Sequence, residues 1–490
     1  MAVSRYSILA LATILSCQPQ EPAQRVGQLE LTPVTVRTHE GPEQSAEAEE
    51  GSLYVPERWE DTTGATIKLH FYRYAATGDE PGPPIVYLAG GPGGSGSGSS
   101  SGDRFPFFQA LREAGDVIAW DQRGANGTEP RLVCPNSYDY PLDVPADPEI
   151  MTPILEGFAE ECVAHWEAQG VDLAAYHTNA SADDLEALRV ALGAEQLTLW
   201  GISYGTHLAL AYMRRYPDRV HKAVLAGVEG PAHTLKLPSN LDRTLARADS
   251  LVKTDPEARA IAPDIVGTTR AIMERLEREP VFVQAPGPGG DPVTVALSKF
   301  DVQDAFVDLL GDDEDIALLA VAVRALGEGD FSPLAAVEAS QRRGRRASAM
   351  AAAMDCASGV SPERRARIAR EAETSILGDA VNFPFPEICE FFPHTDLGPE
   401  FRSPVSGDMP VLFISGTLDA RTPPSNAEEV QAGFPNSEHM IIENGTHDDD
   451  LLIVSPLILQ GVLQFLRGEP VSEPRIRLDR EFVTTAPWEN

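Results

Sequence analysis

Two serines in this chain of 490 residues lie at the centre of a Gly-x-Ser-x-Gly pattern, which can expose a nucleophilic hydroxyl for acyl transfer. Residues 201–205 (Gly-Ile-Ser-Tyr-Gly) follow a strand-like run and precede a helix-like one. Glycines on either side of Ser203 would let the strand and the helix pack closely, with the hydroxyl at a helix N-terminus. Residues 98–102 (Gly-Ser-Ser-Ser-Gly) have no strand leading into them and are interpreted as a chance match in a loop. A serine in a tight turn is the non-catalytic alternative, but the strand-to-helix context favours Ser203 as the nucleophile.

A nucleophilic serine needs a general base that accepts its proton during attack. His447 is the predicted base, because it follows the strand-like run 440–442 across a short loop. A loop after a strand lies at the carboxyl edge of a parallel sheet, where open α/β sheets place their sites. His439 is the competing histidine, but it precedes the same run and would lie at the opposite edge.

An acid is expected to orient this base and to stabilise its cationic form. Asp419 is the predicted acid, because it follows the strand-like run 411–415 across a short loop and would reach the same edge. Two further aspartates are weaker alternatives, Asp408 and Asp448. With Asp419 the chain order is serine, acid, histidine, which is the order in the α/β-hydrolase fold.

Acyl transfer also needs two N–H groups that bind the negative oxygen of the tetrahedral intermediate. One is expected from Tyr204, immediately after the nucleophile. The second is expected from the glycine-rich loop 90–96, which follows the apolar run 85–89 and whose backbone could approach a substrate closely. A phosphate-binding role for this loop is disfavoured, because neither a Gly-Lys-Ser/Thr ending nor a dinucleotide fingerprint accompanies it.

From about residue 66, short apolar runs bounded by Gly or Asp alternate with helical patterns, as in a parallel sheet covered by helices. The predicted strands cover residues 85–89, 116–120, 197–200, 223–226, 411–414 and 440–442. Residues 238–400 are instead rich in Ala, Arg, Glu and Leu at helical spacing, with a Pro- and Gly-rich loop at 284–295. We therefore predict an α/β-hydrolase fold: a mostly parallel sheet flanked by helices, with an inserted helical cap.

The start of the chain has the pattern of an export signal, with Arg5 before a short apolar run and Ser16 and Cys17 after it. Residues 14–17 (Ile-Leu-Ser-Cys) are similar to a bacterial lipobox, in which the cysteine becomes the lipidated first residue. An ordinary secretory signal with an incidental cysteine is the alternative. We expect an exported protein, either anchored in the cell envelope through Cys17 or periplasmic or secreted. The predicted organisation is a signal peptide over 1–17, a tether over 18–45, a core in two parts over 46–237 and 401–470, the cap over 238–400 and a tail over 471–490.

Four further cysteines suggest two disulfides, because even numbers of cysteine in exported chains tend to pair. Three pairings are possible, and pairing by sequence neighbourhood favours Cys134–Cys162 and Cys356–Cys389. The sequence has no CxxC pair and no cysteine–histidine cluster with zinc spacing. We therefore expect neither a metal nor another cofactor.

The formal net charge is −35 at pH 7, from 39 Lys and Arg against 74 Asp and Glu. Such an acidic chain repels phosphate backbones, so no nucleic-acid partner is expected, and the surplus should form a solvated surface. No segment is long and apolar enough to cross a membrane as a lasting helix, so membrane contact is expected only through a lipid anchor.

Taken together, these motifs resemble those of the prolyl aminopeptidase and tripeptidyl aminopeptidase family of serine peptidases. The resemblance covers about residues 50–470, with a loose match over the cap. Five motifs carry it: the glycine loop at 90–96, Asp-Gln-Arg-Gly at 121–124, Gly-Ile-Ser-Tyr-Gly-Thr at 201–206, the TAP-like stretch 410–423 and Gly-Thr-His at 445–447. It implies a triad of Ser203, Asp419 and His447, with Gly91 and Tyr204 as oxyanion donors. It also implies exopeptidase action on short peptides at a free N-terminus.

Recognition of an N-terminal ammonium requires a carboxylate in the pocket. Glu229 follows the apolar run 223–228 and could face the site. Three cap acids are equally admissible, Asp355, Glu387 and Glu390. The aromatic and proline cluster 383–386 could line an apolar pocket or pack in the core. A carboxylesterase or lipase using the same triad is the rival hypothesis, and a non-catalytic binding protein of the same fold is the third.

Overall fold

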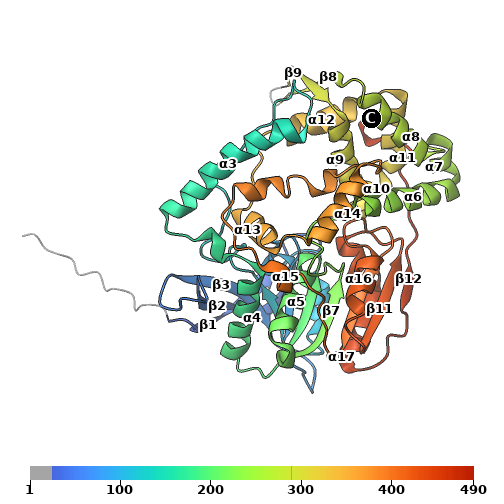
Figure 1. Ribbon diagram of the computed structural model, residues 1–490. Coiled ribbons are helices and arrows are strands. Elements are labelled where there is room, and N and C mark those ends of the chain that lie inside the picture. Colours follow the sequence, from blue (N-terminus) through green and yellow to red (C-terminus); the bar gives the residue numbers. More distant parts are fainter. Residues whose placement is uncertain (1–24, 288–289, 490) are drawn as a thin grey trace, which may run out of the picture.

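The computed structural model describes residues 25–287 and 290–489, and Figure 1 shows a sheet with flanking helices below a helical cap. The predicted signal peptide and Cys17 lie outside the described residues. One ten-stranded sheet forms the core. Its strands are, in spatial order, β1 (Leu29–Arg37), β2 (Ser45–Pro56), β3 (Thr66–Tyr74), β5 (Val117–Trp120), β4 (Ile85–Leu88), β6 (Leu197–Ile202), β7 (Val220–Ala226), β10 (Val411–Gly416), β11 (Ser437–Glu443) and β12 (Arg475–Arg477).

The strands from β5 to β12 pair in parallel throughout. Every residue of β4, β5, β6 and β10 is buried, as expected for strands covered on both faces. Each of the six predicted apolar runs coincides with one of these parallel strands. The predicted α/β-hydrolase fold with a mostly parallel sheet is therefore confirmed.

The first three strands are antiparallel, and the sequence reasoning missed β1 and β2. The predicted tether over 18–45 is wrong for residues 29–37, because β1 pairs along its whole length with β2, from Leu29 opposite Leu53 to Arg37 opposite Ser45. Most residues of β1 are partly or fully exposed. Its polar and apolar residues therefore alternate, and no continuous apolar run marks it as a strand.

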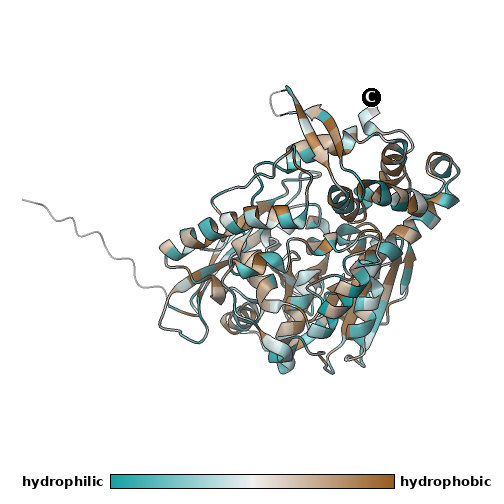
Figure 2. Ribbon diagram, turned by 45° about the horizontal axis from the view of Figure 1, so that its top comes forward, coloured by the Kyte–Doolittle hydropathy of each residue, from teal (hydrophilic) through white to brown (hydrophobic). Residues whose placement is uncertain are grey.

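Side chains alternate between the two faces of the central strands, and each face has its own apolar core. On β4, Val86 and Leu88 belong to one core, and Ile85 and Tyr87 to the other. The first core is covered by α4 (Thr178–Ala191), α5 (Tyr204–Arg215) and α16 (Pro424–Gln431), the second by α2 (Phe105–Leu111) and α17 (Pro456–Arg467). The helices in Figure 2 show both teal and brown segments, as expected for elements with one buried face.

The cap is mainly helical and has a separate apolar core. Its helices are α6 (Pro238–Thr254), α7 (Pro256–Ile261), α8 (Ile265–Leu276), α9 (Lys299–Leu309), α10 (Asp313–Ala317), α11 (Leu319–Glu328), α12 (Ser332–Gln341), α13 (Ala349–Ser358), α14 (Pro362–Ala372), η3 (Ala380–Asn382), η4 (Glu387–Glu390) and α15 (Gly398–Phe401). The predicted loop at 284–295 is too long, because its two ends belong to β8 (Val281–Pro286) and β9 (Pro292–Leu297), which pair as an antiparallel hairpin. The Pro and Gly residues that suggested a loop lie between these strands or at their ends.

Helix α3 (Pro148–Ala168) lies beside the cap in Figure 1, although its sequence was assigned to the first part of the core. It contacts η4 of the cap. Its buried residues Phe158, Cys162 and Trp166 pack in the same cluster as Ile388. The cap therefore includes a segment that precedes β6 in the chain.

The predicted tail at 471–490 is part of the fold. β12 pairs with β11 as the last strand of the sheet. Further on, the Val483 N–H donates to the Ala317 carbonyl of α10 (2.8 Å), and Phe482 is buried in the core of the cap. This C-terminal segment, residues 475–489, therefore joins the sheet to the cap. Its apolar residues are separated by charged ones, which is why no strand was predicted.

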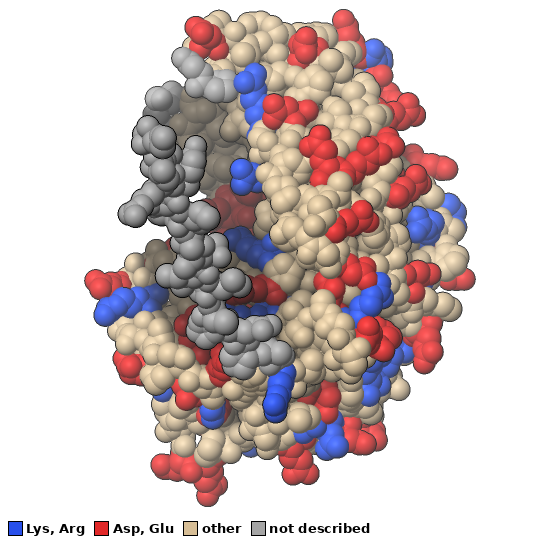
Figure 3. Space-filling model, turned by 90° about the vertical axis from the view of Figure 1, so that its left-hand side faces the viewer, with Lys and Arg blue, Asp and Glu red and all other residues tan. Residues whose placement is uncertain are grey.

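Acidic side chains are spread over both the core and the cap on the face shown in Figure 3. This distribution agrees with the solvated acidic surface expected from a net charge of −35. Across residues 25–287 and 290–489, no helix combines the length and the apolar character that crossing a membrane requires.

Candidate active site

Ser203 occupies a sharp turn between β6 and α5. Its φ of 53° lies in the left-handed region that side chains other than glycine rarely adopt, a strain typical of functional sites. The flanking glycines allow this turn: a Cβ on Gly201 would lie 2.7 Å from the Gly205 carbonyl oxygen, and one on Gly205 would lie 1.9 Å from the Leu88 carbonyl oxygen. The predicted elbow is therefore present, and only glycine fits on either side of the serine.

Asp419 and His447 form a direct pair, with 2.9 Å between Asp419 Oδ2 and His447 Nδ1. The same aspartate accepts the Arg421 N–H (2.9 Å), the Thr422 N–H (2.7 Å) and the Thr422 hydroxyl (2.6 Å). Burial would raise the pKa of Asp419, but the charge of His447 and the hydrogen bonds from His447 and Thr422 outweigh it and lower the pKa. A carboxylate accepts only, so Nδ1 carries the hydrogen and Nε2 is free to accept a proton.

The sheet brings the three predicted triad residues to one edge. They follow β6, β10 and β11, and in the sheet these strands lie on either side of β7 in the order β6-β7-β10-β11. The Ser203 N–H donates to Ala226 at the end of β7 (3.0 Å). A Cβ on the next residue, Gly227, would lie 3.2 Å from His447 Cε1. Ser203 and His447 thus flank the end of the same strand.

The competing residues lie elsewhere. His439 is inside β11, where its Nε2 lies 3.0 Å from Ser415 Oγ and burial lowers its pKa to about 4. Asp408 is exposed before β10. Asp448 is exposed and pairs with Arg104. Among the contacts of the described residues, none of these three side chains forms a hydrogen bond or an ion pair with Asp419 or His447.

The glycine-rich loop after β4 passes directly beside the nucleophile. A Cβ on Gly90 would lie 3.1 Å from Ser203 Cβ and 3.7 Å from its Oγ. Gly91 has a φ of 114°, which strongly favours glycine. Tyr204 begins α5, so its N–H is at the helix N-terminus next to the serine. Both predicted oxyanion donors therefore belong to backbone that borders Ser203.

The structure gives roles to three residues of the Asp-Gln-Arg-Gly motif, to which sequence reasoning assigned none. Asp121 accepts from the hydroxyls of Ser95 (2.9 Å) and Ser97 (2.5 Å) at the start of α1 (Gly96–Ser99). Gln122 donates to the Ala89 carbonyl (3.0 Å), so the two residues fix the glycine loop at both ends. The Arg123 side chain is fully buried and forms a bidentate ion pair with Asp184 (2.6 and 2.7 Å). That pair anchors the loop after β5 to α4.

Two of the four candidate amine-binding acids come together. Glu229 follows β7, is buried, and lies 2.5 Å from Lys236 Nζ. Asp355 lies on α13 of the cap. Burial raises the pKa of Asp355 well above its usual value, and the charge of Glu229 raises it further while Lys236 opposes this. The two carboxylates are thus close enough to interact, one from the core and one from the cap.

Met354, which precedes Asp355 in α13, contacts Tyr204, which follows Ser203. Met354 Sδ lies 2.9 Å from the Tyr204 hydroxyl, which also bonds to Thr178 Oγ1 (2.9 Å). Asp355 itself lines a cavity of about 340 Å³ together with Phe385 and the disulfide of Cys356. This cavity therefore begins at the helix that covers Tyr204.

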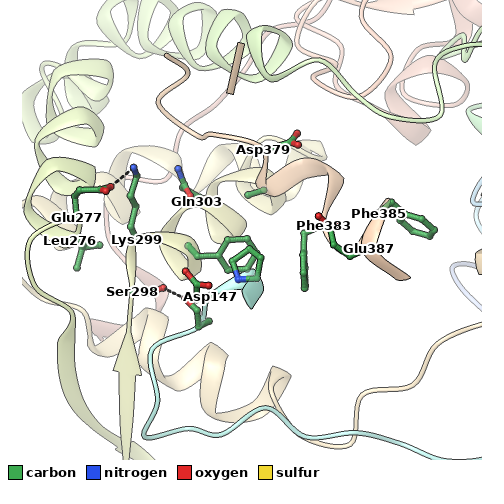
Figure 4. Close-up of a pocket in the computed structure, with 14 residues that line it drawn as sticks. Asp147, Leu276, Glu277, Ser298, Lys299, Gln303, Asp379, Phe383, Phe385 and Glu387 are labelled. Carbon is green, nitrogen blue, oxygen red and sulfur yellow. Dashed lines mark hydrogen bonds and ion pairs between the residues drawn. The ribbon is translucent and has the colours of Figure 1, made fainter. Parts of the chain in front are cut away.

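The other two candidate acids point elsewhere. Glu387 lines a second cavity, of about 450 Å³, within the cap. Figure 4 shows Phe383, Phe385 and Glu387 on one side of this cavity and Glu277 and Lys299 on the other. Glu390 is exposed at the surface. The aromatic cluster 383–386 thus lines cavities, and Phe385 borders both of them.

Both disulfides have the pairing expected from sequence neighbourhood. Cys134 bonds to Cys162 and Cys356 bonds to Cys389, with Cα separations of 5.1 and 5.3 Å. The first joins the loop after β5 to α3, and the second joins α13 to η4. Stable disulfides form in oxidising compartments, so they indicate an exported protein. Within the described part of the chain, no group of three or more His, Cys, Asp or Glu residues could hold a metal ion.

Two family profiles match the chain. The profile described as alpha/beta hydrolase fold matches residues 83–271, which include Ser203. The profile described as TAP-like protein matches residues 378–468, which include Asp419 and His447. The matches confirm the fold and the TAP-like segment that the motifs indicated.

Similar proteins are named as peptidases or hydrolases. The chain is 32% identical over 194 residues to serine protease Hip1 of Mycobacterium tuberculosis, covering 37% of this chain and 36% of that protein. It is 29% identical over 215 residues to tripeptidyl aminopeptidase of Streptomyces lividans, covering 40% and 38%. It is 25% identical over 409 residues to putative hydrolase YuaR of Escherichia coli, covering 78% and 79%. The first two matches span little more than a third of either relative. The chain therefore has an α/β-hydrolase fold with a TAP-like C-terminal region, and it is similar to proteins named as serine protease and tripeptidyl aminopeptidase.

Proposed function

We propose that the chain is a serine aminopeptidase that removes residues from the N-terminus of short peptides. The observation that carries this proposal is that two acids lie beside contacts of the first turn of α5, which follows Ser203. The Glu229 N–H donates to Thr206 Oγ1 (2.8 Å), and Met354, which precedes Asp355, contacts the Tyr204 hydroxyl. An esterase that acts on a neutral acyl group needs the triad but not these two carboxylates. A free N-terminal ammonium requires such a group. The names of the similar proteins support the same reading.

The proposed reaction proceeds through an acyl-enzyme. Ser203 Oγ attacks the scissile carbonyl carbon while His447 Nε2 takes the hydroxyl proton. The N–H groups of Gly91 and Tyr204 bind the resulting oxyanion. The C–N bond then breaks, His447 returns the proton to the leaving amine, and water hydrolyses the ester by the same route. Asp419 stays ionised and stabilises the cationic imidazole in both steps.

We assign the substrate ammonium to Asp355, with Glu229 contributing its charge. The Glu229 carboxylate already pairs with Lys236, whereas no hydrogen bond or ion pair of the Asp355 carboxylate is among the contacts of the described residues. Asp355 also lines a cavity, so a ligand can reach it. An arriving ammonium would offset the cost of ionising this acid, whose pKa is raised in the free protein.

One set of substrates tests the proposal against its rivals. Purified protein is assayed with aminoacyl and tripeptidyl anilides, the same anilides with an acetylated amine, and short acyl esters. An aminopeptidase hydrolyses the free-amine anilides and discriminates against the acetylated ones. Turnover of esters alone would replace the proposal with an esterase. Absence of any turnover would favour a binding protein.

Asp355→Asn is expected to lower kcat/KM for free-amine anilides by about 10- to 100-fold, because a hydrogen-bonded charge contributes about 1.5–3 kcal/mol. The loss should be mainly in KM, and acetylated substrates should be unaffected. The loss is measured by comparing kcat/KM for each free-amine anilide with kcat/KM for the same anilide carrying an acetylated amine. Glu390→Gln is the matched control, since it removes an exposed acid of the cap and should change neither value. An equal loss of kcat/KM on acetylated substrates would show that Asp355 does not bind the substrate ammonium.

We also propose that the exported protein is anchored by a lipid on Cys17, with membrane contact only through this anchor. The lipobox-like residues 14–17 and the disulfides support export to the cell envelope. Mass spectrometry of the mature N-terminus should find a lipidated Cys17. Cys17→Ala should release the protein from the membrane fraction. An unmodified N-terminus at any other residue would mean an ordinary secretory signal.

The proposed partners are short peptides and no nucleic acid. The acidic surface supports the second part, because it repels phosphate backbones. The cap supports the first, because its cavities of about 340 and 450 Å³ have room for a few residues and not for a folded chain.

A further inference from the structure

The loop between β11 and His447 is held from three directions at Asn444. This residue has a left-handed φ of 63°, and its N–H donates to Thr417 Oγ1 of the core (2.8 Å). Its side chain accepts from Arg247 of cap helix α6 (3.0 Å) and donates to the Leu478 carbonyl of the C-terminal segment (2.9 Å). Core, cap and C-terminal segment therefore meet three residues before the proposed base.

Asp450 fixes the chain immediately around His447. Its Oδ2 accepts the Thr446 N–H (2.8 Å) and the Thr446 hydroxyl (2.7 Å), so it links the residue before His447 to the turn after it. Its side chain is 1% exposed. A carboxylate buried to this degree needs a cationic partner to remain ionised in place.

Arg480 of the C-terminal segment supplies that cation. Its Nη2 pairs with Asp450 Oδ2, and its Nε donates to the Asn444 carbonyl (2.7 Å). Its Nη1 lies 3.9 Å from Asp313 Oδ2 at the start of cap helix α10. One guanidinium thus contacts the chain before His447, the chain after it, and the cap.

We infer that Arg480 is a positioning residue for His447, and that the C-terminal segment links the cap to the loop of the base. The inference rests on the proposed function, because Arg480 acts only through His447. The segment is anchored at both ends: β12 pairs with β11, and the Val483 N–H bonds to Ala317 in the cap. Arg480 lies between these anchors and has little freedom to move away.

Arg480→Gln is expected to lower kcat about 100-fold with KM nearly unchanged, because a misplacement of about 1 Å at the base has that effect while the amine pocket stays intact. The assay is hydrolysis of a tripeptidyl anilide, with kcat expressed per active site titrated by a fluorophosphonate. The rate constant for fluorophosphonate labelling should fall by a similar factor, because phosphonylation of Ser203 also needs His447. Titration removes any effect of a smaller folded fraction.

Two further variants keep the test specific. Arg480→Lys retains the cation but loses the hydrogen bond to the Asn444 carbonyl, so a loss of kcat of about tenfold is expected. This variant replaces Arg480→Gln if the glutamine variant does not fold. Arg475→Gln is the matched control, because Arg475 lies in β12 and pairs with Glu443 (2.7 Å) on an exposed surface. It should leave kcat and the labelling rate at wild-type values.

The outcomes separate this inference from the proposed function. A wild-type labelling rate and kcat in Arg480→Gln would overturn the positioning role and leave Ser203 as the nucleophile. Equal losses in Arg480→Gln and Arg475→Gln would show general loosening of the segment and would also overturn it. Failure of the wild-type protein to label at Ser203 would remove the proposed function, and this inference with it.

Discussion

Ser203→Ala should lower kcat on a tripeptidyl anilide by roughly 10⁵- to 10⁶-fold, the size of loss seen when the nucleophile of a triad is removed. The reason is geometric: the elbow between β6 and α5 presents this one hydroxyl beside the glycine loop, and a Cβ on Gly90 would lie 3.7 Å from its Oγ. Initial rates measure the loss, and mass spectrometry after fluorophosphonate labelling locates the modified residue. Substrate binding should persist, since alanine leaves the amine pocket in place.

Ser100→Ala is the matched control, because Ser100 is the central serine of the second Gly-x-Ser-x-Gly copy. It follows the short helix α1, and its hydroxyl donates to the Ser97 carbonyl (2.9 Å) and bonds to Tyr74 (3.0 Å). Its loss should lower the free energy of unfolding by about 1 kcal/mol and leave kcat unchanged. Labelling at Ser100, or turnover retained in Ser203→Ala, would contradict the assignment of the nucleophile.

Asp419→Asn is expected to lower kcat about 10⁴-fold with the backbone of the site intact. An amide can donate to His447 Nδ1 and so favour the wrong tautomer, and it cannot stabilise the imidazolium. The pKa of Asp419 lies below its usual value, so in the wild type this carboxylate is ionised throughout the neutral range. Rate measurements on titrated active sites, with circular dichroism to confirm folding, test the effect.

Asp408→Asn provides the comparison for Asp419, since it changes an exposed aspartate just before β10 in the same way. It should leave kcat within about twofold of wild type, as surface substitutions usually do. A loss of less than about tenfold in Asp419→Asn would mean that another group orients His447.

The positions of the triad residues could be predicted because buried parallel strands have a recognisable sequence pattern. Strands buried on both faces need unbroken apolar runs, and loops after them meet at one edge. Ser203, Asp419 and His447 each follow such a run, so their meeting point follows from local pattern alone. The two disulfides could also be predicted, since each joins two cysteines that are consecutive among the four, 28 and 33 residues apart.

Other features depend on contacts between distant segments, which leave no local pattern. β1 has one exposed face and therefore no apolar run. Arg480 reaches Asp450 from a segment with isolated apolar residues, and nothing in its neighbourhood marks it. The structural role of Asp121 also depends on such contacts. The carboxylate is fully buried and therefore needs hydrogen-bond partners, but its burial is not visible in the sequence motif. Among the candidate acids, only the packing of α13 against the core separates Asp355 from Glu387 and Glu390.

The apolar core of the cap includes Leu418 and Ala420, the two residues that flank Asp419, as well as Phe482 from the C-terminal segment. The cap is consequently no detachable module. Deleting it, or exchanging it for the cap of a relative, would strip apolar contacts from both neighbours of the proposed catalytic acid. Substrate preference should then be changed by substitutions along the two cap cavities, with the cap's attachment kept. An engineer who wishes to change specificity would do best to begin at Phe385, which borders both.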